Sequence, residues 1–562
     1  MDFSVFDIVT FFVFVSAVVG ISLYAGRHEK SGKDYFLAGR SLTWPFIGFS
    51  LIASNISTEH FVGMAGQGFG RVGLAIASYE WMSAITLVFV AWWLLPKFLK
   101  AGIYTMPEYL EYRYDSGTRT IMAIFLLAAY VIVFLSTVVY SGAMAVITIF
   151  NIPELFTNWF GMGEENAIFW SLWAVVWVIG IIAASVTIYG GLKSVVWADL
   201  IQGSGLLLGG AMVAVVALLA IGDNNFVEGV KTFATEQSGK LHTVLPWNDP
   251  DVPWLAVFIG GLWIPNIFYW GLNQFITQRT LGAKSLAEGQ KGIFFAAWLK
   301  LLVPFVIVMP GIMAFQLYGP DGSGALAADQ GDMAYSYMIR NLLPGYLRGA
   351  MFAALCGAVI SSFNSGLNSA STILTVDLYE KYLNPQASEK RILLVGRVAT
   401  ACVLVVACLW APIITKFEGV FRYIQEIWGF ISPGIVAAFL VGMVLKKAPA
   451  LAAKTAMITG MGLYGLFRVP GWIMAAAWER GEIAEGTFAY YVYQFSTMAF
   501  LHHMAIIFII LAVIMAIITL VRPLTEPRTM PVSELDVRPH KHKYLIGGIT
   551  IAATVVLYII FW

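Results

Sequence analysis

Two charged residues stand alone inside long apolar stretches of this 562-residue chain. Glu80 lies in AIASYEWMSAITL, and Lys300 lies in FFAAWLKLLVPF. If these stretches cross a membrane, each charge costs about 2.5 kcal/mol or more to insert, so each invites a functional interpretation. A carboxylate and an ammonium can accept and donate hydrogen bonds to a polar solute. Two alternatives stay open: an ion pair that only fixes helix packing, or a Glu80 close enough to the surface to be solvated.

Oxygen-bearing side chains could also bind a cation. Ser361 and Ser362 lie in the hydroxyl-rich stretch LCGAVISSFNSGLNSAST. Adjacent hydroxyls with free carbonyl oxygens suit a hard cation, although serines in helices also bond to their own helix carbonyls. Asp199, in YGGLKSVVWADLIQ, is either an ordinary surface charge or a cation relay near the cytoplasmic mouth.

Composition decides the setting of these residues. The chain is 59% hydrophobic and 12% charged, whereas soluble domains are about 45–50% apolar and 25% charged. A soluble globule and a disordered chain are therefore excluded. With 34 basic and 33 acidic residues, no basic patch is large enough for nucleic acid. Walker A, HExxH and GxSxG motifs are missing, so we expect neither ATP-driven transport nor an enzyme.

The apolar residues fall into runs that match membrane helices. A bilayer core about 30 Å thick needs about 20 apolar residues per helix, and runs of this length in lipid must be helical. We therefore expect an all-α membrane protein with about 14 transmembrane helices. The runs are 5–25, 44–68, 76–99, 120–150, 166–189, 195–221, 253–278, 290–318, 347–376, 392–414, 423–445, 450–467, 495–521 and 544–562.

Basic residues predict the orientation of these spans. Most of the 34 lysines and arginines lie in alternate loops, beginning with the loop that carries Arg27, Lys30, Lys33 and Arg40. Basic loops face the cytoplasm. An even number of crossings then puts both termini on the extracellular or periplasmic side of the plasma (inner) membrane. Lys300 is the one basic residue that this count assigns to the interior of a span.

Two spans do not have the pattern of plain helices. The second contains the largely polar segment 53–60, and the seventh contains Gly260-Gly261 and then Pro265-Asn266. Five crossings separate these spans, so they run in opposite directions. A pair of interrupted spans in inverted positions is typical of the binding site of a secondary transporter. The alternative is that these small and polar residues only allow close helix packing.

Several sequence blocks resemble the sodium:solute symporter family, and within it the sodium/glucose and sodium/galactose cotransporters. They are DYFLAGRSLTWP, SLIASNIS, GLAIASYEWMSAITL, GIYTMPEYLEYR, YGGLKSVVWADLIQ, NQFITQRTLGAKS, GAVISSFNSGLNSASTI and FRYIQEIWGFISPGI. The resemblance implies a LeuT-type five-plus-five inverted repeat, with one extra helix before it and three after it. The chain is then one transporter domain, 1–562. Its parts are an extra first helix and cytoplasmic loop (1–40), a first repeat (41–222), a second repeat (250–446) and extra C-terminal helices (447–562).

The resemblance also implies site residues. The solute-binding positions of the family fall on Asn55, His60, Glu80, Ser83, Asn266, Lys300 and Gln425, and the gating aromatic falls on Tyr269. The sodium positions fall on Ala53, Ile56, Ala358, Ser361 and Ser362, and Asp199 falls on an acidic residue linked to sodium exit or a second cation site. Bacterial galactose transporters of the family carry glutamine at the position of His60, whereas mammalian glucose transporters carry histidine.

We therefore expect a sodium-coupled symporter whose partners are a neutral monosaccharide, such as galactose or glucose, sodium ions and the lipid bilayer. The nearest alternative is a symporter of the same family for inositol, sialic acid or an amino acid, although the charges of Glu80 and Lys300 weigh against amino acids. A non-transporting sugar sensor and a channel are weaker alternatives. A sensor is expected to carry a signalling domain, and a channel needs a continuous polar pore.

Overall fold

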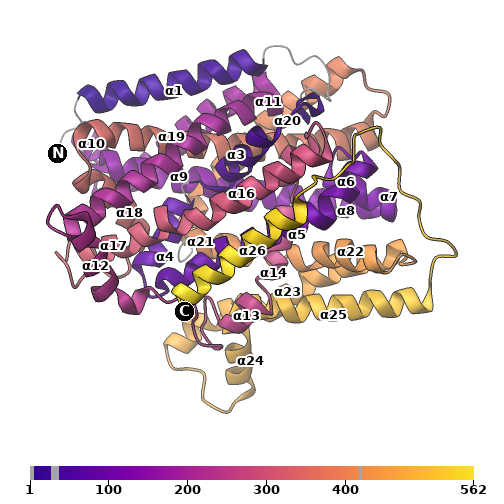
Figure 1. Ribbon diagram of the computed structural model, residues 1–562. Coiled ribbons are helices and arrows are strands. Elements are labelled where there is room, and N and C mark those ends of the chain that lie inside the picture. Colours follow the sequence, from indigo (N-terminus) through magenta and orange to yellow (C-terminus); the bar gives the residue numbers. More distant parts are fainter. Residues whose placement is uncertain (1–4, 27–36, 58, 417–419) are drawn as a thin grey trace.

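The computed structural model describes residues 5–26, 37–57, 59–416 and 420–562, which form a bundle of helices (Figure 1). Arg27, Lys30 and Lys33 of the predicted first loop lie outside the described residues. In the described part, the β pairing consists of two isolated bridges between single residues. The expectation of an all-α protein is confirmed.

Eleven helical segments in the described part are long and apolar enough to cross a membrane. They match the predicted spans three to ten and twelve to fourteen. The segments are Gly73–Ala101, Ser116–Thr148, Glu164–Ser185, Leu192–Ile221, Trp254–Leu272, Leu286–Tyr318, Leu347–Leu383, Glu389–Thr415, Ala450–Glu479, Phe500–Val521 and Lys543–Ile560.

The other three predicted spans are also helical. The first is α1 (Val5–Gly26), a single helix of 22 residues. The second and eleventh are each built from short pieces, and the eleventh consists of α21 (Val420–Trp428) and α22 (Ser432–Val444). The interruption between α21 and α22 was not predicted. Further helices are α6 (Leu95–Ala101), α9 (Ser136–Phe150), α10 (Ile152–Phe160), α12 (Phe226–Glu236), α17 (Val308–Tyr318), α18 (Gly331–Leu342), α20 (Glu389–Trp410), α23 (Ala450–Glu479) and α24 (Phe488–Thr497).

The predicted interruption of the second span is confirmed. Helix α3 (Trp44–Asn55) ends where Ile56 adopts extended backbone angles, φ −76° and ψ 102°. The chain becomes helical again in the π-helical segment η2 (His60–Met64), followed by α4 (Ala65–Phe69). Because α3 ends here, the carbonyl groups of its last turn have no following helical N–H partners.

The seventh span is interrupted twice, and only one interruption was predicted. Helix α13 (Trp254–Phe258) ends before Gly260-Gly261, as expected. Gly261 is required because a Cβ there would lie 1.6 Å from the carbonyl oxygen of Leu501 on α25 (Phe500–Val521). The predicted break at Pro265-Asn266 is wrong, since both residues belong to α14 (Trp263–Ile267). Proline is tolerated in the first turn of a helix, where its missing N–H has no intrahelical partner.

The second interruption falls at Asn273, which separates η7 (Phe268–Leu272) from α15 (Gln274–Leu281). Asn273 is extended, with φ −84° and ψ 124°. Its side-chain oxygen accepts a hydrogen bond from the hydroxyl of Tyr130. The same hydroxyl accepts the N–H of Phe275 at 3.2 Å. A residue distant in sequence therefore replaces the helical partners at this break.

The two helices that carry the isolated charges are neighbours. Glu80 is in the first turn of α5 (Ser78–Phe89), and Lys300 is in α16 (Leu286–Val306), which packs against both α5 and α3. The contact with α3 is close, because a Cβ at Gly48 would lie 2.9 Å from the carbonyl oxygen of Gly292. Small residues permit such backbone approach between membrane helices. Helix α26 (Lys543–Ile560) covers α5 from outside.

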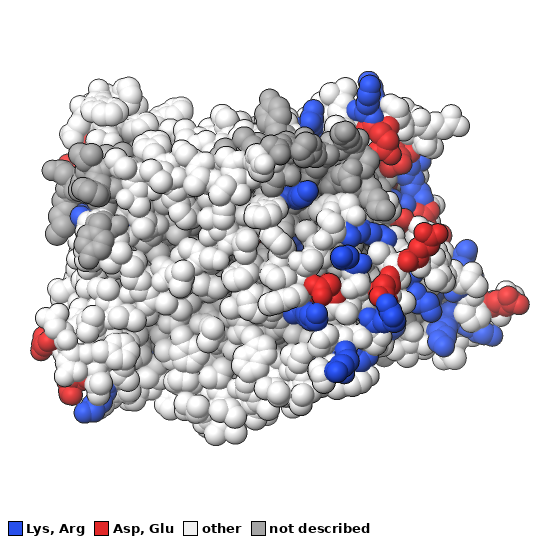
Figure 2. Space-filling view, turned by 45° about the horizontal axis from the view of Figure 1, so that its top comes forward, with Lys and Arg blue, Asp and Glu red and all other residues white. Residues whose placement is uncertain are grey.

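Most of the visible charge lies toward one end of the molecule, on the right in Figure 2, and the surface between the two ends is largely uncharged. Helix α1 begins and α26 ends toward the opposite end (Figure 1). Charged ends around an uncharged belt are the arrangement expected of a membrane-spanning bundle.

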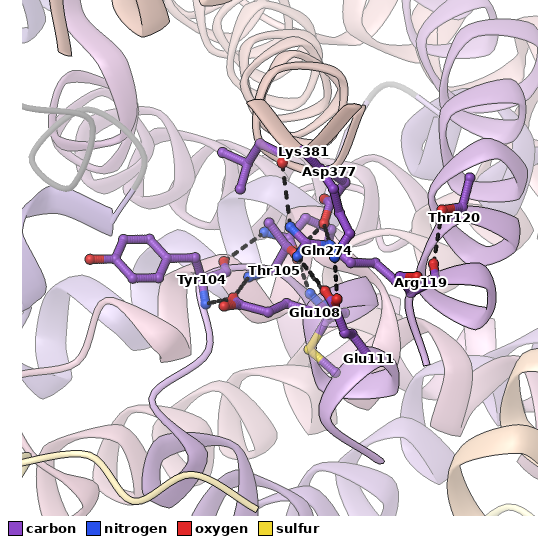
Figure 3. Close-up of polar contacts among 12 residues, drawn as sticks. Tyr104, Thr105, Glu108, Glu111, Arg119, Thr120, Gln274, Asp377 and Lys381 are labelled. Carbon is purple, nitrogen blue, oxygen red and sulfur yellow. Dashed lines mark hydrogen bonds and ion pairs between the residues drawn. The ribbon is translucent and has the colours of Figure 1, made fainter. Parts of the chain in front are cut away.

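A polar network joins several segments of the chain (Figure 3). Glu111 of α7 (Met106–Arg113) accepts hydrogen bonds from Lys381 and, at 2.7 Å, from Arg119 of α8 (Ser116–Ala129). Arg119 also donates to Asp377 of η8 (Ile373–Leu383) at 2.6 Å. Burial alone would raise the pKa of Glu111, but the bonds from Lys381 and Arg119 lower it below its ordinary value. Arg119 had been counted as a loop residue, and the structure buries it instead.

Candidate functional site

The two interrupted spans meet at a cavity inside the bundle. The cavity encloses about 650 Å³, including its mouth, which is within the range of small-molecule sites. Its walls come from α3, η2, α5, α14, η7, α16 and α21. All seven solute-binding residues inferred from the sequence line it, namely Asn55, His60, Glu80, Ser83, Asn266, Lys300 and Gln425, together with the gating residue Tyr269.

Glu80 and Lys300 form an ion pair at the cavity wall. The Lys300 ammonium donates to Oε2 of Glu80 and to Oδ1 of Asn55, and it lies 5.0 Å from the ring centre of Trp270. Glu80 is 3% exposed and Lys300 is 0% exposed. The alternative of a solvated Glu80 at the surface is therefore wrong. The pair holds α5 and α16 together, and both side chains also face the cavity, so packing is not their only available role.

His60 lies between two carboxylates. Its Nε2 is 3.6 Å from Oε1 of Glu80, and its Nδ1 is 3.7 Å from Oε1 of Glu59. Glu59 lines the cavity and is buried, but the sequence did not mark it as a site residue. The signal was available, because Glu59 is a second carboxylate in the interrupted span. Such residues inside a membrane protein invite the same interpretation as Glu80.

Short polar contacts connect the remaining cavity residues. The Ser83 hydroxyl lies 2.6 Å from the carbonyl oxygen of Tyr79 and 3.0 Å from Oδ1 of Asn266. Asn55 donates to the hydroxyl of Tyr269 at 3.0 Å. The side-chain nitrogen of Asn266 is buried without a hydrogen-bond partner. A buried donor of this kind is costly to leave unpaired, so it favours a ligand that offers an acceptor.

Asp199 is the centre of a second polar cluster. It is 0% exposed, so the alternative of an ordinary surface charge is wrong. Its carboxylate accepts from the hydroxyls of Ser50 and Ser361 and, at 3.2 Å, from Ser54. Asp199 belongs to α11 (Glu164–Ile221), which packs along both α3 and α19 (Gly345–Thr372). The cluster therefore joins three helices.

A buried arginine neutralises this cluster. Nη2 of Arg279 lies 3.4 Å from Oδ2 of Asp199 and also donates to Ser365. The sequence count placed Arg279 in a loop, and this placement is wrong, since the residue is 0% exposed. The reason is the break at Asn273, after which α15 continues with Arg279 directed against α3 and α19.

The residues inferred to bind sodium lie beside this cluster. Ala53 is in the last turn of α3, Ile56 follows the end of that helix, and Ala358, Ser361 and Ser362 belong to α19. The Ser362 hydroxyl is 3.4 Å from the carbonyl oxygen of Ser54, which brings α19 against the interruption. The hydroxyls of Ser361 and Ser362 thus contact other helices rather than their own. Across the described residues, no group of three or more His, Cys, Asp or Glu side chains could hold a metal ion.

A multi-pass helical bundle whose interrupted helices meet at a polar cavity defines a secondary transporter. The family model of the sodium:solute symporter family matches residues 35–460, and the chain belongs to that family. The sodium/glucose cotransporter of Vibrio parahaemolyticus is 42% identical over 476 residues, covering 82% of this chain and 84% of the relative. The sodium/myo-inositol cotransporter 2 of Sus scrofa is 33% identical, covering 82% of this chain and 69% of the relative.

The fold also matches solved transporters. A Na⁺-coupled sialic acid symporter in a substrate-bound outward-open state superposes with a TM-score of 0.72 at 19% identity, covering 94% of this chain and all of the other chain. The protein is therefore a multi-pass membrane transporter with the LeuT-type fold.

Proposed function

We propose that this protein is a sodium-coupled symporter that imports a neutral monosaccharide, such as galactose or glucose, by alternating access. The observation that carries the proposal is the cavity in which seven inferred solute-binding side chains from both interrupted spans and their neighbours come together. We further propose that the protein resides in the plasma (inner) membrane with both termini outside, and that the repeats 41–222 and 250–446 exchange access to the cavity.

The chemistry of the cavity suits a polyol. A sugar hydroxyl both donates and accepts, so it can bond to the Glu80 carboxylate, the Lys300 ammonium and the unpaired Asn266 amide in one orientation. The rings of Phe268, Tyr269 and other aromatic residues in the wall offer apolar faces for the sugar ring. A site built from buried hydrogen-bonding groups rejects an analogue that lacks a hydroxyl, because its own groups are then left unpaired.

Sodium is proposed to bind at Ala53, Ile56, Ala358, Ser361 and Ser362, the first three through backbone carbonyls. An ion there would order the end of α3, which also carries Asn55 of the cavity, and so favour solute binding. Such coupling is reciprocal, so solute binding must favour sodium binding equally. Asp199 is proposed to act in sodium exit or as a second cation site.

The sodium gradient supplies enough free energy for accumulation. One sodium ion crossing about 100 mV releases roughly 2.3 kcal/mol, and a tenfold concentration gradient adds about 1.4 kcal/mol. Together these terms support several-hundred-fold solute accumulation per coupled ion.

A second candidate is a symporter for myo-inositol, which is also a neutral polyol. The 33% identity to a sodium/myo-inositol cotransporter favours it. Sialic acid is an anion, and an amino acid carries two opposite charges. Neither needs the full set of neutral hydrogen-bonding groups in the cavity.

Uptake of labelled solutes into proteoliposomes tests the proposal. Purified protein is reconstituted, and galactose, glucose and myo-inositol uptake is measured with and without an inward sodium gradient. We expect sodium-dependent uptake of a monosaccharide, abolished by a sodium ionophore. Uptake that is indifferent to sodium would contradict symport, and uptake of myo-inositol alone would replace the proposed solute.

A further inference from the structure

Glu59 and His60 form a pair at the cavity wall that the proposed solute site does not use fully. The Glu59 carboxylate lies 3.7 Å from Nδ1 of His60, and its other oxygen is buried without a hydrogen-bond partner. On the far side of the ring, Nε2 of His60 lies 3.6 Å from Glu80. Both members of the pair are buried and line the cavity.

The formal charges of the cavity do not balance without a further proton. Glu59 and Glu80 contribute two negative charges, whereas Lys300 contributes one positive charge and bonds directly to Glu80. An uncompensated carboxylate in a buried site costs several kcal/mol. One proton on the Glu59–His60 pair removes that charge, because the imidazole can share a proton with the adjacent carboxylate.

We propose that Glu59 and His60 together bind one proton in the solute cavity. In this arrangement the proton lies between Glu59 and Nδ1, and Nε2 keeps its hydrogen toward Glu80 and the solute. Glu59 is thus a positioning residue that acts through His60. The identity of the solute rests on the proposed function, but the proton site does not.

The other titratable groups around the pair have partners of their own. Lys300 of α16 bonds to Glu80 of α5 and to Asn55. The Tyr269 hydroxyl of η7 accepts from Asn55. Tyr79 of α5 also lines the cavity. Tyrosine is neutral over the range in which an imidazole titrates, so the pair accounts for the titration expected there.

Loss of the proton weakens solute binding. When the solute fills the cavity, it removes water from the oxygen of Glu59 that has no protein partner. Removing water from a neutral pair costs little, whereas removing it from an unneutralised carboxylate is unfavourable. The KM for the solute is therefore constant at low pH and rises above the titration of the pair, by up to about tenfold per pH unit for a single linked proton.

Uptake kinetics between pH 6 and pH 9.5, with equal pH on both sides of the membrane, test this inference. The parent should show the rise in KM, and Glu59→Gln, which keeps the side-chain size but cannot hold the proton, should show a flat KM. Glu485→Gln is the matched control, since Glu485 is exposed outside the cavity. A flat parent profile, or a rise that persists in Glu59→Gln, would overturn the proton site. A persistent rise would assign the titration to Lys300.

A measurement without solute separates this inference from the proposed function. The unfolding midpoint of purified protein in detergent is compared between the parent and Glu59→Gln across the same pH range. The bound proton stabilises the folded parent at low pH, so the difference between the two proteins should change as the proton leaves. If no sugar is transported but this difference changes with pH, the proposed function fails and the proton site stands. A difference independent of pH overturns the proton site.

Discussion

Removing the carboxylate of Glu80 tests whether its pair with Lys300 serves the solute or only the packing. Glu80→Gln leaves the Lys300 ammonium buried at 0% exposure without its ion-pair partner. Removing one member of a buried pair costs about 3–5 kcal/mol of stability. The double variant Glu80→Gln/Lys300→Met removes both charges, so its stability should return to within about 1 kcal/mol of the parent.

Solute binding should respond differently from stability. A hydrogen bond to a charged group contributes about 1.5–3 kcal/mol, which is roughly a 10- to 150-fold change in affinity. The single and the double variant both lack the Glu80 acceptor, so both should lose at least this affinity. Sodium binding should survive in both, because Ser361 and Ser362 belong to a different helix.

Two assays on the same preparations separate the roles. The free energy of unfolding is measured in detergent micelles, and solute affinity and sodium affinity are measured in proteoliposomes. The reasoning is refuted if Glu80→Gln is as stable as the parent, because the buried pair would then be absent. A double variant that binds solute like the parent would show that the pair serves packing alone.

Three further perturbations address other parts of the molecule. Ser362→Ala removes a proposed sodium ligand, so the sodium concentration for half-maximal uptake should rise about tenfold or more while solute binding at saturating sodium is retained. Arg279→Met leaves Asp199 buried and unpaired, so it should destabilise the protein by about 3–5 kcal/mol, and adding Asp199→Asn should restore most of that loss in denaturant titrations. The lowered pKa of Glu111 means that its bonds stabilise the protein above pH 4.5, and this contribution should disappear as the pH falls through the lower folded value. Unfolding midpoints of the parent and Glu111→Gln should therefore converge in acid.

Each of these outcomes can fail in a specific way. An unchanged sodium requirement in Ser362→Ala would remove that residue from the proposed ligands. A stable Arg279→Met protein would mean that the Asp199 carboxylate finds another partner. A difference between the parent and Glu111→Gln that is constant down to pH 3 would show that the bonds from Lys381 and Arg119 do not depend on the Glu111 charge.

Local sequence patterns predicted most of the helices because insertion into lipid depends on a window of about 20 residues. The long apolar runs match the observed spans, and the polar segment after Asn55 marks a real break. The break at Asn273 could not be predicted in this way. It depends on the hydroxyl of Tyr130, which lies on another helix and replaces the local backbone partners.

The site divides along the same line. Glu80 and Lys300 could be identified because a charge in an apolar run is conspicuous without any knowledge of its neighbours. Arg279 lies near the end of a span in a polar stretch, so its sequence resembles that of a loop. Its burial follows from Asp199, about 80 residues earlier, whose carboxylate compensates the guanidinium in the interior.

The sequence by itself determined the class of the protein, since composition and apolar runs require a helical membrane bundle and the motif blocks indicate the symporter family. It also determined which residues are candidates, because charges and hydroxyls in lipid-like surroundings are costly. Only the tertiary structure decided which candidates meet. The pairing of Glu80 with Lys300, of Asp199 with Arg279 and of Glu59 with His60 depends on how helices distant in sequence pack. Electrostatic compensation acts over a few ångströms of space, regardless of separation along the chain.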